Sequence, residues 1–192
     1  MPRCKVCNEP TTRKFGLTAL CSVDHAVEYA QRKASKKHKA EARKAERELK
    51  RIHKEQKERI KTRSEWLATL QKLVNQYVVK VRDVNEACCT CGTRNNVKYD
   101  AGHCFTRKAR PELSFELTNI HKQCSVQCNQ HGSGMRAEYF EFIKDRYGED
   151  HFAWLEGPHP GLKEQFPDIS DIKAEISRYR SLIRDSGLNP IR

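Results

Sequence analysis

Two sets of closely spaced cysteine and histidine residues constrain this sequence more than any other feature. Each set consists of two pairs, with two or three residues between the members of a pair and a loop between the pairs. The first set is Cys4, Cys7, Cys21 and His25, and the second is Cys88, Cys91, Cys124 and Cys128. A tetrahedral Zn²⁺ suits this pattern because each pair sits on one turn and the ion joins the two turns. Four protein ligands leave no open coordination position, so both predicted zinc sites are structural.

The expected cellular compartment also favours metal binding over disulfide bonds for these cysteines. No stretch reaches the roughly 18 apolar residues of a membrane helix, and the first residues lack the apolar core of a signal peptide. We therefore expect the protein to stay in the cytosol, away from membranes, where reductants keep thiols free. Cys89 competes with Cys88 as a ligand, and we prefer Cys88 because two intervening residues give the usual knuckle turn. Cys89 and Cys104 are then interpreted as plain thiols.

Charge indicates the class of partner. The chain carries a formal charge of +12, and a surplus of this size usually means a polyanionic partner, with nucleic acid as the default. Residues 31–63 hold fifteen Lys or Arg and five Glu, so they carry +10 of this charge. The hydrophobic fraction is 37%. Counting Gly in place of Tyr, which matches the residue set used for ordinary domains, still leaves the fraction below their roughly 45–50%. The apolar core must be small, and zinc can replace part of it.

Composition divides the chain into three predicted segments. Residues 1–25 form an N-terminal zinc module, residues 26–63 a basic helical arm, and residues 64–192 the remainder. The arm has no Pro or Gly and is rich in Ala, Lys, Arg and Glu, as long helices are. A short coiled-coil seam, which would make the protein a homodimer, follows 3-4 spacing at Ala42, Ala45, Leu49, Ile52 and Gln56. The alternative is a solvated single helix with ion pairs such as Glu55 to Arg59.

The third segment combines helices with short strands, so the predicted fold class is α+β. Ser64 is the expected N-cap of a helix with apolar residues at Leu67, Leu70, Leu73, Val74, Tyr77, Val78 and Val81. Short strands are expected at 97–99 and 115–120, and helices at 137–147, ending at Gly148, and at 150–156. A last helix, capped by Asp168 or Ser170, carries a stripe of Ile169, Ile172, Ile176, Tyr179 and Ile183. Trp66 and Trp154 are predicted to lie in the core.

The segment around the second cysteine set resembles a known family. The runs concerned are Tyr99-Asp100-Ala101-Gly102-His103, Asn119-Ile120-His121-Lys122-Gln123-Cys124 and Cys128-Asn129-Gln130-His131-Gly132-Ser133-Gly134. They resemble the NinG family of lambdoid phages, also called Rap, and the segment is also similar to zinc-bearing HNH, or ββα-metal, nucleases of the endonuclease VII type. The resemblance implies a structure-specific endonuclease that cleaves branched DNA, such as Holliday junctions and D-loops, in the bacterial host cytoplasm. Phage or host recombination proteins are the implied partners.

The resemblance also assigns roles to individual residues. His103 corresponds to the general base, Asn129 to a ligand of the catalytic divalent ion, and Asn119 to the residue that fixes the loop and histidine geometry. HNH sites commonly have an Asp or His directly before the base, but here that residue is Gly102. The nearest carboxylate is Asp100.

The ligand set of the catalytic ion therefore stays open. Asp100 is the candidate that completes the site, and His121 and His131 are alternatives to it. Oxygen ligands from Asp and Asn suit Mg²⁺ or Mn²⁺ better than zinc. The zinc-type knuckle also departs from the usual pattern, because three residues rather than two separate Cys124 from Cys128.

A second function class remains open alongside the nuclease. The protein could be a non-catalytic, zinc-dependent nucleic-acid-binding adaptor in phage recombination or regulation, and Gly102 favours this alternative. The retained His103 and Asn129 favour the enzyme. A basic run at Arg107, Lys108 and Arg110 either contacts phosphates beside the scissile bond or forms a solvated loop.

Overall fold

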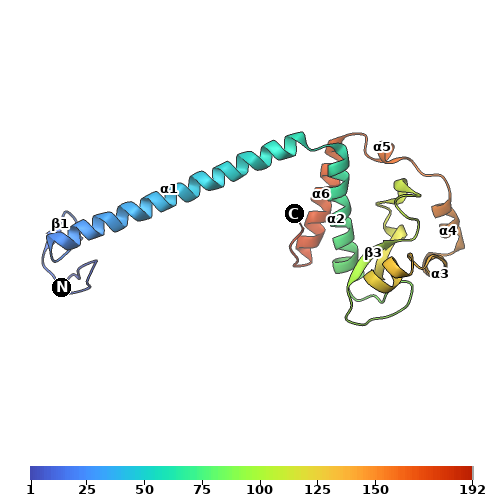
Figure 1. The fold of residues 1–192 in the computed structure, drawn as a ribbon, viewed down its shortest axis with the longest axis horizontal. Coiled ribbons are helices and arrows are strands. Elements are labelled where there is room, and N and C mark those ends of the chain that lie inside the picture. Colours follow the sequence, from blue (N-terminus) through green and yellow to red (C-terminus); the bar gives the residue numbers. More distant parts are fainter. Residues whose placement is uncertain (192) are drawn as a thin grey trace. The chain divides into compact units, whose positions relative to one another are not determined.

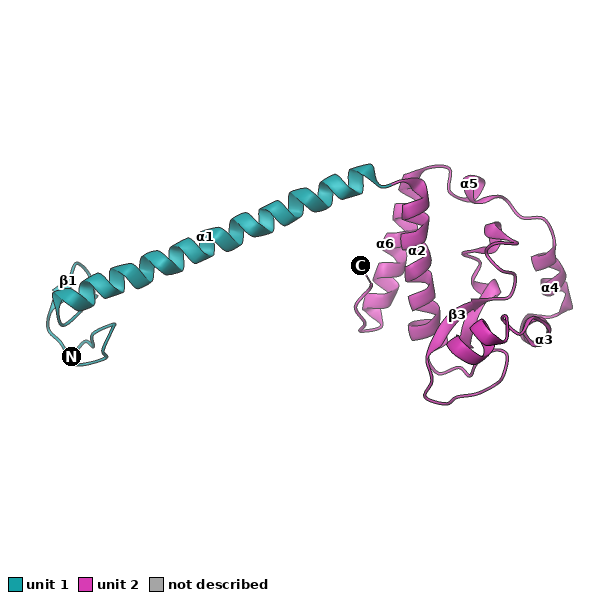
Figure 2. Ribbon diagram, viewed as in Figure 1, with its two compact units in different colours: residues 1–61 teal, residues 62–192 magenta. Residues whose placement is uncertain are grey.

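The computed structural model describes residues 1–191 and divides the chain into two compact units, Met1–Lys61 and Thr62–Arg192 (Figure 2). Each unit is described by itself. Within the described residues, no helix combines the length and the apolar character needed to cross a membrane.

The first unit begins with a small hairpin and continues into one long helix (Figure 1). Strands β1 (Lys14–Phe15) and β2 (Thr18–Ala19) pair antiparallel around Gly16, whose φ of 60° suits glycine. Helix α1 (Val23–Ile60) follows directly. Its N-cap is Ser22, which accepts a hydrogen bond from the backbone N–H of His25. The cap therefore fixes His25 in the first helical turn.

Helix α1 confirms the long helix predicted for the arm, although it begins before residue 26. Its 38 residues span about 57 Å at 1.5 Å per residue, and none of them is buried. Leu49 and Ile52, the large residues of the seam, are 55% and 40% exposed within this chain. Glu55 lies 3.6 Å from Arg51, one turn before it, instead of pairing with Arg59 as expected.

The second unit opens with helix α2 (Arg63–Tyr77), which continues into a π-helical turn at Val78–Arg82. The predicted cap at Ser64 is wrong, because Thr62 caps this helix. The Thr62 hydroxyl accepts from the Glu65 N–H, and the Glu65 carboxylate accepts from the Thr62 N–H. Ser64 has Leu67 three residues later and lacks this reciprocal partner.

Helix α6 (Ile169–Asp185) packs along α2 and forms the larger hydrophobic core (Figure 1). Asp168 caps it, forming a capping box with Asp171. The buried side chains of this core are Trp66, Leu70, Leu73, Val74, Val78, Ile120, Phe166, Ile172, Ile176, Tyr179 and Ile183. The predicted stripe is therefore confirmed except at Ile169, which is 37% exposed in the first turn of α6.

A two-stranded antiparallel sheet lies next to this core. Strands β3 (Tyr99–His103) and β4 (Ile120–Cys124) pair with His103 opposite Ile120, and a helical segment at Ser125–His131 follows. Both strands lie later in the chain than predicted. Glu116 accepts hydrogen bonds from the backbone and hydroxyl of Thr118, which holds a 3₁₀ turn at Leu117–Asn119 where a strand was expected. The mixed helix and strand content agrees with the α+β class.

Three further helices complete the second unit. Helix α3 (Arg136–Tyr147) ends at Gly148, whose φ is 91°, and α4 (Glu149–Glu156) packs against it, followed by the short α5 (Leu162–Gln165). Trp154 is 49% exposed, so its predicted core position is wrong. Phe152 and Leu155 occupy the buried side of α4, and Trp154 projects about 200° around the helix from Phe152.

Candidate functional site

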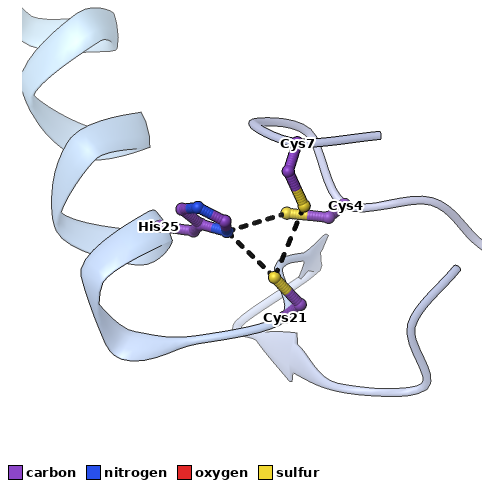
Figure 3. A group of neighbouring side chains, drawn as sticks. All are labelled: Cys4, Cys7, Cys21 and His25. Carbon is purple, nitrogen blue, oxygen red and sulfur yellow. Dashed lines mark hydrogen bonds between the residues drawn. The ribbon is translucent and has the colours of Figure 1, made fainter. Parts of the chain in front are cut away.

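The first ligand set converges as its spacing predicts (Figure 3). Its four ligand atoms lie within 4.8 Å of one another, with Cys7 Sγ 3.6 Å from Cys21 Sγ and Cys4 Sγ 3.6 Å from His25 Nδ1. Zn–S bonds of about 2.3 Å place two sulfurs of a tetrahedral site about 3.8 Å apart, whereas a disulfide requires about 2.05 Å. The donor set therefore fits a zinc ion.

Local backbone geometry prepares this set for a metal. The turn after Cys4 closes with a hydrogen bond from the Asn8 N–H to the Cys4 carbonyl, and Asn8 has a φ of 63°. Burial raises the pKa of the Cys4 thiol, but backbone N–H groups of Cys7, Val6 and Cys21 outweigh burial and lower that pKa to about 6, whereas burial and the neighbouring thiols raise the pKa of Cys21 to about 11. Zinc binds the thiolate, so donors that stabilise the thiolate also favour metal binding.

The second set also converges on one point. Cys88 Sγ lies 3.8 Å from Cys128 Sγ, Cys91 Sγ lies 3.7 Å from Cys124 Sγ, and all four sulfurs lie within 4.8 Å of one another. Cys88 is the one of the two neighbouring cysteines that belongs to this set, whereas Cys89 packs in an apolar cluster that also contains Cys104. The longer spacing from Cys124 to Cys128 coincides with the π-helical geometry of Ser125–His131, which fits more residues into each turn.

A cavity of about 430 Å³ opens beside the second set and brings the proposed base and metal ligand together. His103 at the end of β3 and Asn129 in the helical segment both line it. Three exposed cations, Arg107, Lys108 and Arg136, complete a strongly basic lining. Such a cavity suits a phosphate group.

The hydrogen bonding of His103 defines which ring nitrogen can act as a base. Nε2 lies 3.2 Å from the Ser114 carbonyl oxygen, which can only accept, so Nε2 carries the proton and Nδ1 keeps its lone pair. Burial lowers the pKa of His103 to about 4, the Ser114 carbonyl opposes this effect, and the Arg107 charge adds to it. The imidazole is neutral at pH 7 and able to accept a proton.

Asn119 is fully buried and fixes the loop between the two strands. Its Oδ1 accepts from the Phe105 N–H at 2.8 Å, and its Nδ2 donates to the carbonyls of Phe105 and Leu113, each at 3.1 Å. These contacts tie the start of the loop to its later part. Asn119 thus supports the segment that carries Arg107 and Lys108, and it does not line the cavity.

Asp100 and Asn129 form the oxygen-bearing pair. Asp100 Oδ2 lies 3.5 Å from Asn129 Nδ2 and also accepts a hydrogen bond from the Ser125 hydroxyl. Rotation of the Asn129 amide would turn its oxygen toward the same point, and carboxylate and amide oxygens are ligands of Mg²⁺ and Mn²⁺. Asp100 therefore completes a candidate site for a divalent ion with Asn129.

The two alternative histidines lie elsewhere. His121 is buried, and its Nε2 lies 2.9 Å from the Tyr147 hydroxyl within an aromatic cluster. Burial, together with the charge of Arg82, lowers the pKa of His121 to about 3. His131 is exposed, and neither histidine lines the cavity. Asp100 does not line the cavity either, but its carboxylate lies 3.5 Å from Asn129, which does, and this contact makes it the stronger candidate.

Sequence reasoning missed some cavity residues and misjudged another. Arg136 was missed because its place in the cavity lining depends on the path of the loop before α3. The local sequence signal for that loop was the Gly-Ser-Gly run at 132–134. Arg110 turns away from the cavity and pairs with Glu112 while also donating to the carbonyls of Glu156 and Gly157. Only Arg107 and Lys108 of the basic run remain candidates for phosphate contact.

A larger cavity, of about 850 Å³, lies elsewhere in the second unit. Its charged lining is mostly acidic, with Glu112, Glu116, Asp168, Asp171 and Glu175 against Arg178. Carboxylates repel phosphates, so this cavity is a poorer candidate for a nucleic-acid site than the smaller, basic one.

Comparison with known proteins places the chain in a family. The family model described as Bacteriophage Lambda NinG protein matches residues 1–187. The ninG protein of Escherichia phage 933W is 32% identical over 195 residues, which cover 96% of this chain and 94% of that protein. The ninG protein of Salmonella phage P22 is 37% identical over 127 residues, covering 66% of this chain and 62% of that protein. No solved structure matches the chain. With a family match along nearly its whole length and two clusters that can hold zinc, this chain belongs to the NinG family of bacteriophage proteins.

Proposed function

We propose that this protein is a structure-specific DNA endonuclease that cleaves branched recombination intermediates by metal-dependent phosphodiester hydrolysis. One observation carries the proposal: His103 and Asn129 line the same basic cavity, and Asp100 lies 3.5 Å from Asn129. An imidazole base beside oxygen ligands for a hard cation, within a cationic pocket, suits hydrolysis of a phosphodiester. The similarity of this segment to HNH nucleases points the same way.

The groups that line the cavity and the residues beside it have distinct parts in this mechanism. The Nδ1 atom of His103 takes the proton of the attacking water while the Ser114 carbonyl holds the ring through Nε2. Asp100 and Asn129 would hold Mg²⁺ or Mn²⁺, and such an ion would supply positive charge that offsets the negative charge developing during hydrolysis. Arg107, Lys108 and Arg136 contact the phosphates. Asn119 keeps the loop with two of these cations in place.

The activity is tested with a labelled four-way junction and a linear duplex of the same sequence. The purified, zinc-loaded protein is expected to cleave the junction in Mg²⁺ or Mn²⁺, to spare the duplex, and to be inactive when these two ions are left out. Omission is preferable to a chelator, which would also remove zinc. Binding of the junction without cleavage under every metal condition would contradict the proposal.

That outcome would favour the second candidate, a non-catalytic nucleic-acid-binding adaptor. The specific observation in its favour is the crowded position of Gly102, directly before the proposed base. A Cβ atom built at Gly102 would lie 2.3 Å from Gln123 Oε1, so a metal-binding side chain at this position would have to displace the buried Gln123. The nuclease proposal then depends on Asp100 and Asn129 alone for protein oxygen ligands.

We assign most of the DNA affinity to helix α1. At about 100° per residue, its basic residues from Arg32 to Lys57 fall within less than half of the helix circumference. The seam of Ala42, Ala45, Leu49 and Ile52 lies on the opposite side. One face of α1 is thus a continuous basic surface that can follow a phosphate backbone, and the other remains a candidate dimer seam.

Replacing Lys36, Lys37, Arg43 and Lys44 with glutamine should weaken binding and flatten its salt dependence. Each lost phosphate contact reduces the slope of log affinity against log salt by roughly 0.9 on duplex DNA, so the loss can reach about 3.6. The control replaces Lys72, Lys80, Lys163 and Arg184, which are exposed residues of the second unit, and removes the same charge. Equal slopes for the two variants would mean that α1 does not contact DNA.

A further inference from the structure

Gly102 and Gln123 share one crowded space on the sheet. Asp100 and Gln123 are direct partners in the register of β3 and β4, so Gly102 and Gln123 lie on the same face. A Cβ at Gly102 would meet Gln123 Oε1 at 2.3 Å and the Cβ and Cδ atoms of Gln123 at 3.1 Å. Gln123 is only 1% exposed and has no room to withdraw into solvent. The glycine directly before His103 is therefore required by the glutamine across the sheet.

The carboxamide of Gln123 joins two other parts of the unit. Its Nε2 donates to Thr90 Oγ1 at 3.2 Å and to the Gly134 carbonyl at 2.8 Å. Thr90 lies in the knuckle between Cys88 and Cys91, with its hydroxyl 3.4 Å from Cys88 Sγ. Gly134 lines the basic cavity two residues before Arg136. One buried side chain thus contacts the strand of the base, the knuckle between two residues of the second zinc-ligand set, and the cavity loop.

We propose that Gln123 is a positioning residue for the cleavage reaction, locking the strand that carries His103 and the Gly134 loop to the second zinc-ligand set. This inference rests on the proposed endonuclease function. Both Nε2 hydrogens have fixed acceptors, so the amide has one orientation and its oxygen faces Gly102. Because this buried amide bonds through both of its hydrogens, it favours a single arrangement of the groups around it.

The first test is Gln123→Met in the full chain, which keeps the side-chain volume but removes both donated hydrogen bonds. Single-turnover cleavage of the four-way junction should fall about 10- to 100-fold, because small displacements of catalytic groups cost up to about 10² in rate. Zinc content and junction affinity should not change. Gln165→Met is the control for loss of the two donated bonds at an exposed residue, since Gln165 Nε2 donates to the carbonyls of Glu112 and Pro160, away from the basic cavity.

A double variant separates positioning from a general loss of stability. If Gln123 acts through His103, adding Gln123→Met to His103→Ala should cause little further loss, because the base is already absent. Independent, multiplicative losses would contradict the proposal.

A second pair of variants tests the close approach of Gly102 and Gln123. Gly102→Ala should impair cleavage strongly in the parent chain. It should impair cleavage much less when Gln123 is also alanine, since the clash is then removed. Equal losses in both backgrounds would also overturn the proposal.

A third measurement does not depend on activity. The Gly134 N–H donates to the Cys128 carbonyl at 2.9 Å, so hydrogen exchange at this amide reports on the cavity loop. Gln123→Met should speed exchange at Gly134 and leave helix α6 as in the parent. Unchanged exchange at Gly134 would refute the link between Gln123 and the loop. If the parent protein cleaves no junction but exchange at Gly134 accelerates, the endonuclease proposal fails while this structural link stands.

Discussion

His103→Ala is expected to slow junction cleavage by about 10² to 10⁴-fold, which is the usual contribution of a positioned general base. The neutral imidazole, with its proton held on Nε2 by the Ser114 carbonyl, presents Nδ1 as the acceptor for the proton of the attacking water. Alanine removes that acceptor without touching either zinc-ligand set. Junction affinity and zinc content should therefore match the parent protein, and only the single-turnover cleavage rate should fall.

Asn129→Ala should differ from His103→Ala in its response to metal. Loss of a ligand weakens binding of the divalent ion, and a higher concentration of Mg²⁺ partly offsets that loss by mass action. Cleavage by the Asn129 variant should thus recover partly in a Mg²⁺ titration, whereas the His103 variant should stay slow throughout. His159→Ala, at a histidine outside the basic cavity, is the control. If His103→Ala cleaves the junction as fast as the parent protein, the HNH assignment is wrong and the non-catalytic adaptor becomes the favoured function.

Short-range patterns in the sequence predicted several features of this fold well. Ligand spacing identified the eight side chains that meet in two sets, because a knuckle is a local turn. The absence of Pro and Gly predicted α1, and 3.6-residue periodicity predicted the buried stripe at Ile172, Ile176, Tyr179 and Ile183. In each case the signal is short-range: two ligands on one turn, a helix-forming composition without breakers, or apolar residues three and four positions apart.

The errors come from competing local signals and from contacts across the fold. Thr62 displaced Ser64 as a cap because only Thr62 has Glu65 three residues later, and Glu116 turned the expected second strand into a 3₁₀ turn. The short helix α4 has apolar residues on more than one side, so periodicity could not reveal that Trp154 is exposed. The roles of Arg136, Ser114 and Gln123 depend on long-range packing, which no spacing in one sequence encodes.

Removing zinc from the first ligand set is expected to unfold the N-terminal module while sparing the core of the second unit. Among residues 1–25 only Cys4 and Leu20 are buried, so apolar burial supplies a few kcal/mol at most, at about 1.5–3 kcal/mol per large side chain. Zinc binding supplies about 10–16 kcal/mol in small modules of this kind. The metal is therefore the dominant source of stability there. The second unit keeps the apolar contacts between α2 and α6.

Cys21→Ser tests this difference, with Cys104→Ser, at a thiol outside both sets, as the matched control. Elemental analysis should find two zinc ions per chain in the parent and control proteins and one in the Cys21 variant. Hydrogen exchange in the variant should be fast across residues 1–25, because Ser22 and His25 lose the metal that holds them against the turn after Cys4, while the buried stripe of α6 stays protected. One zinc ion in the parent protein would remove one of the two sites, and an unchanged exchange rate at residues 1–25 in the variant would show that the hairpin and helix cap hold this module without metal.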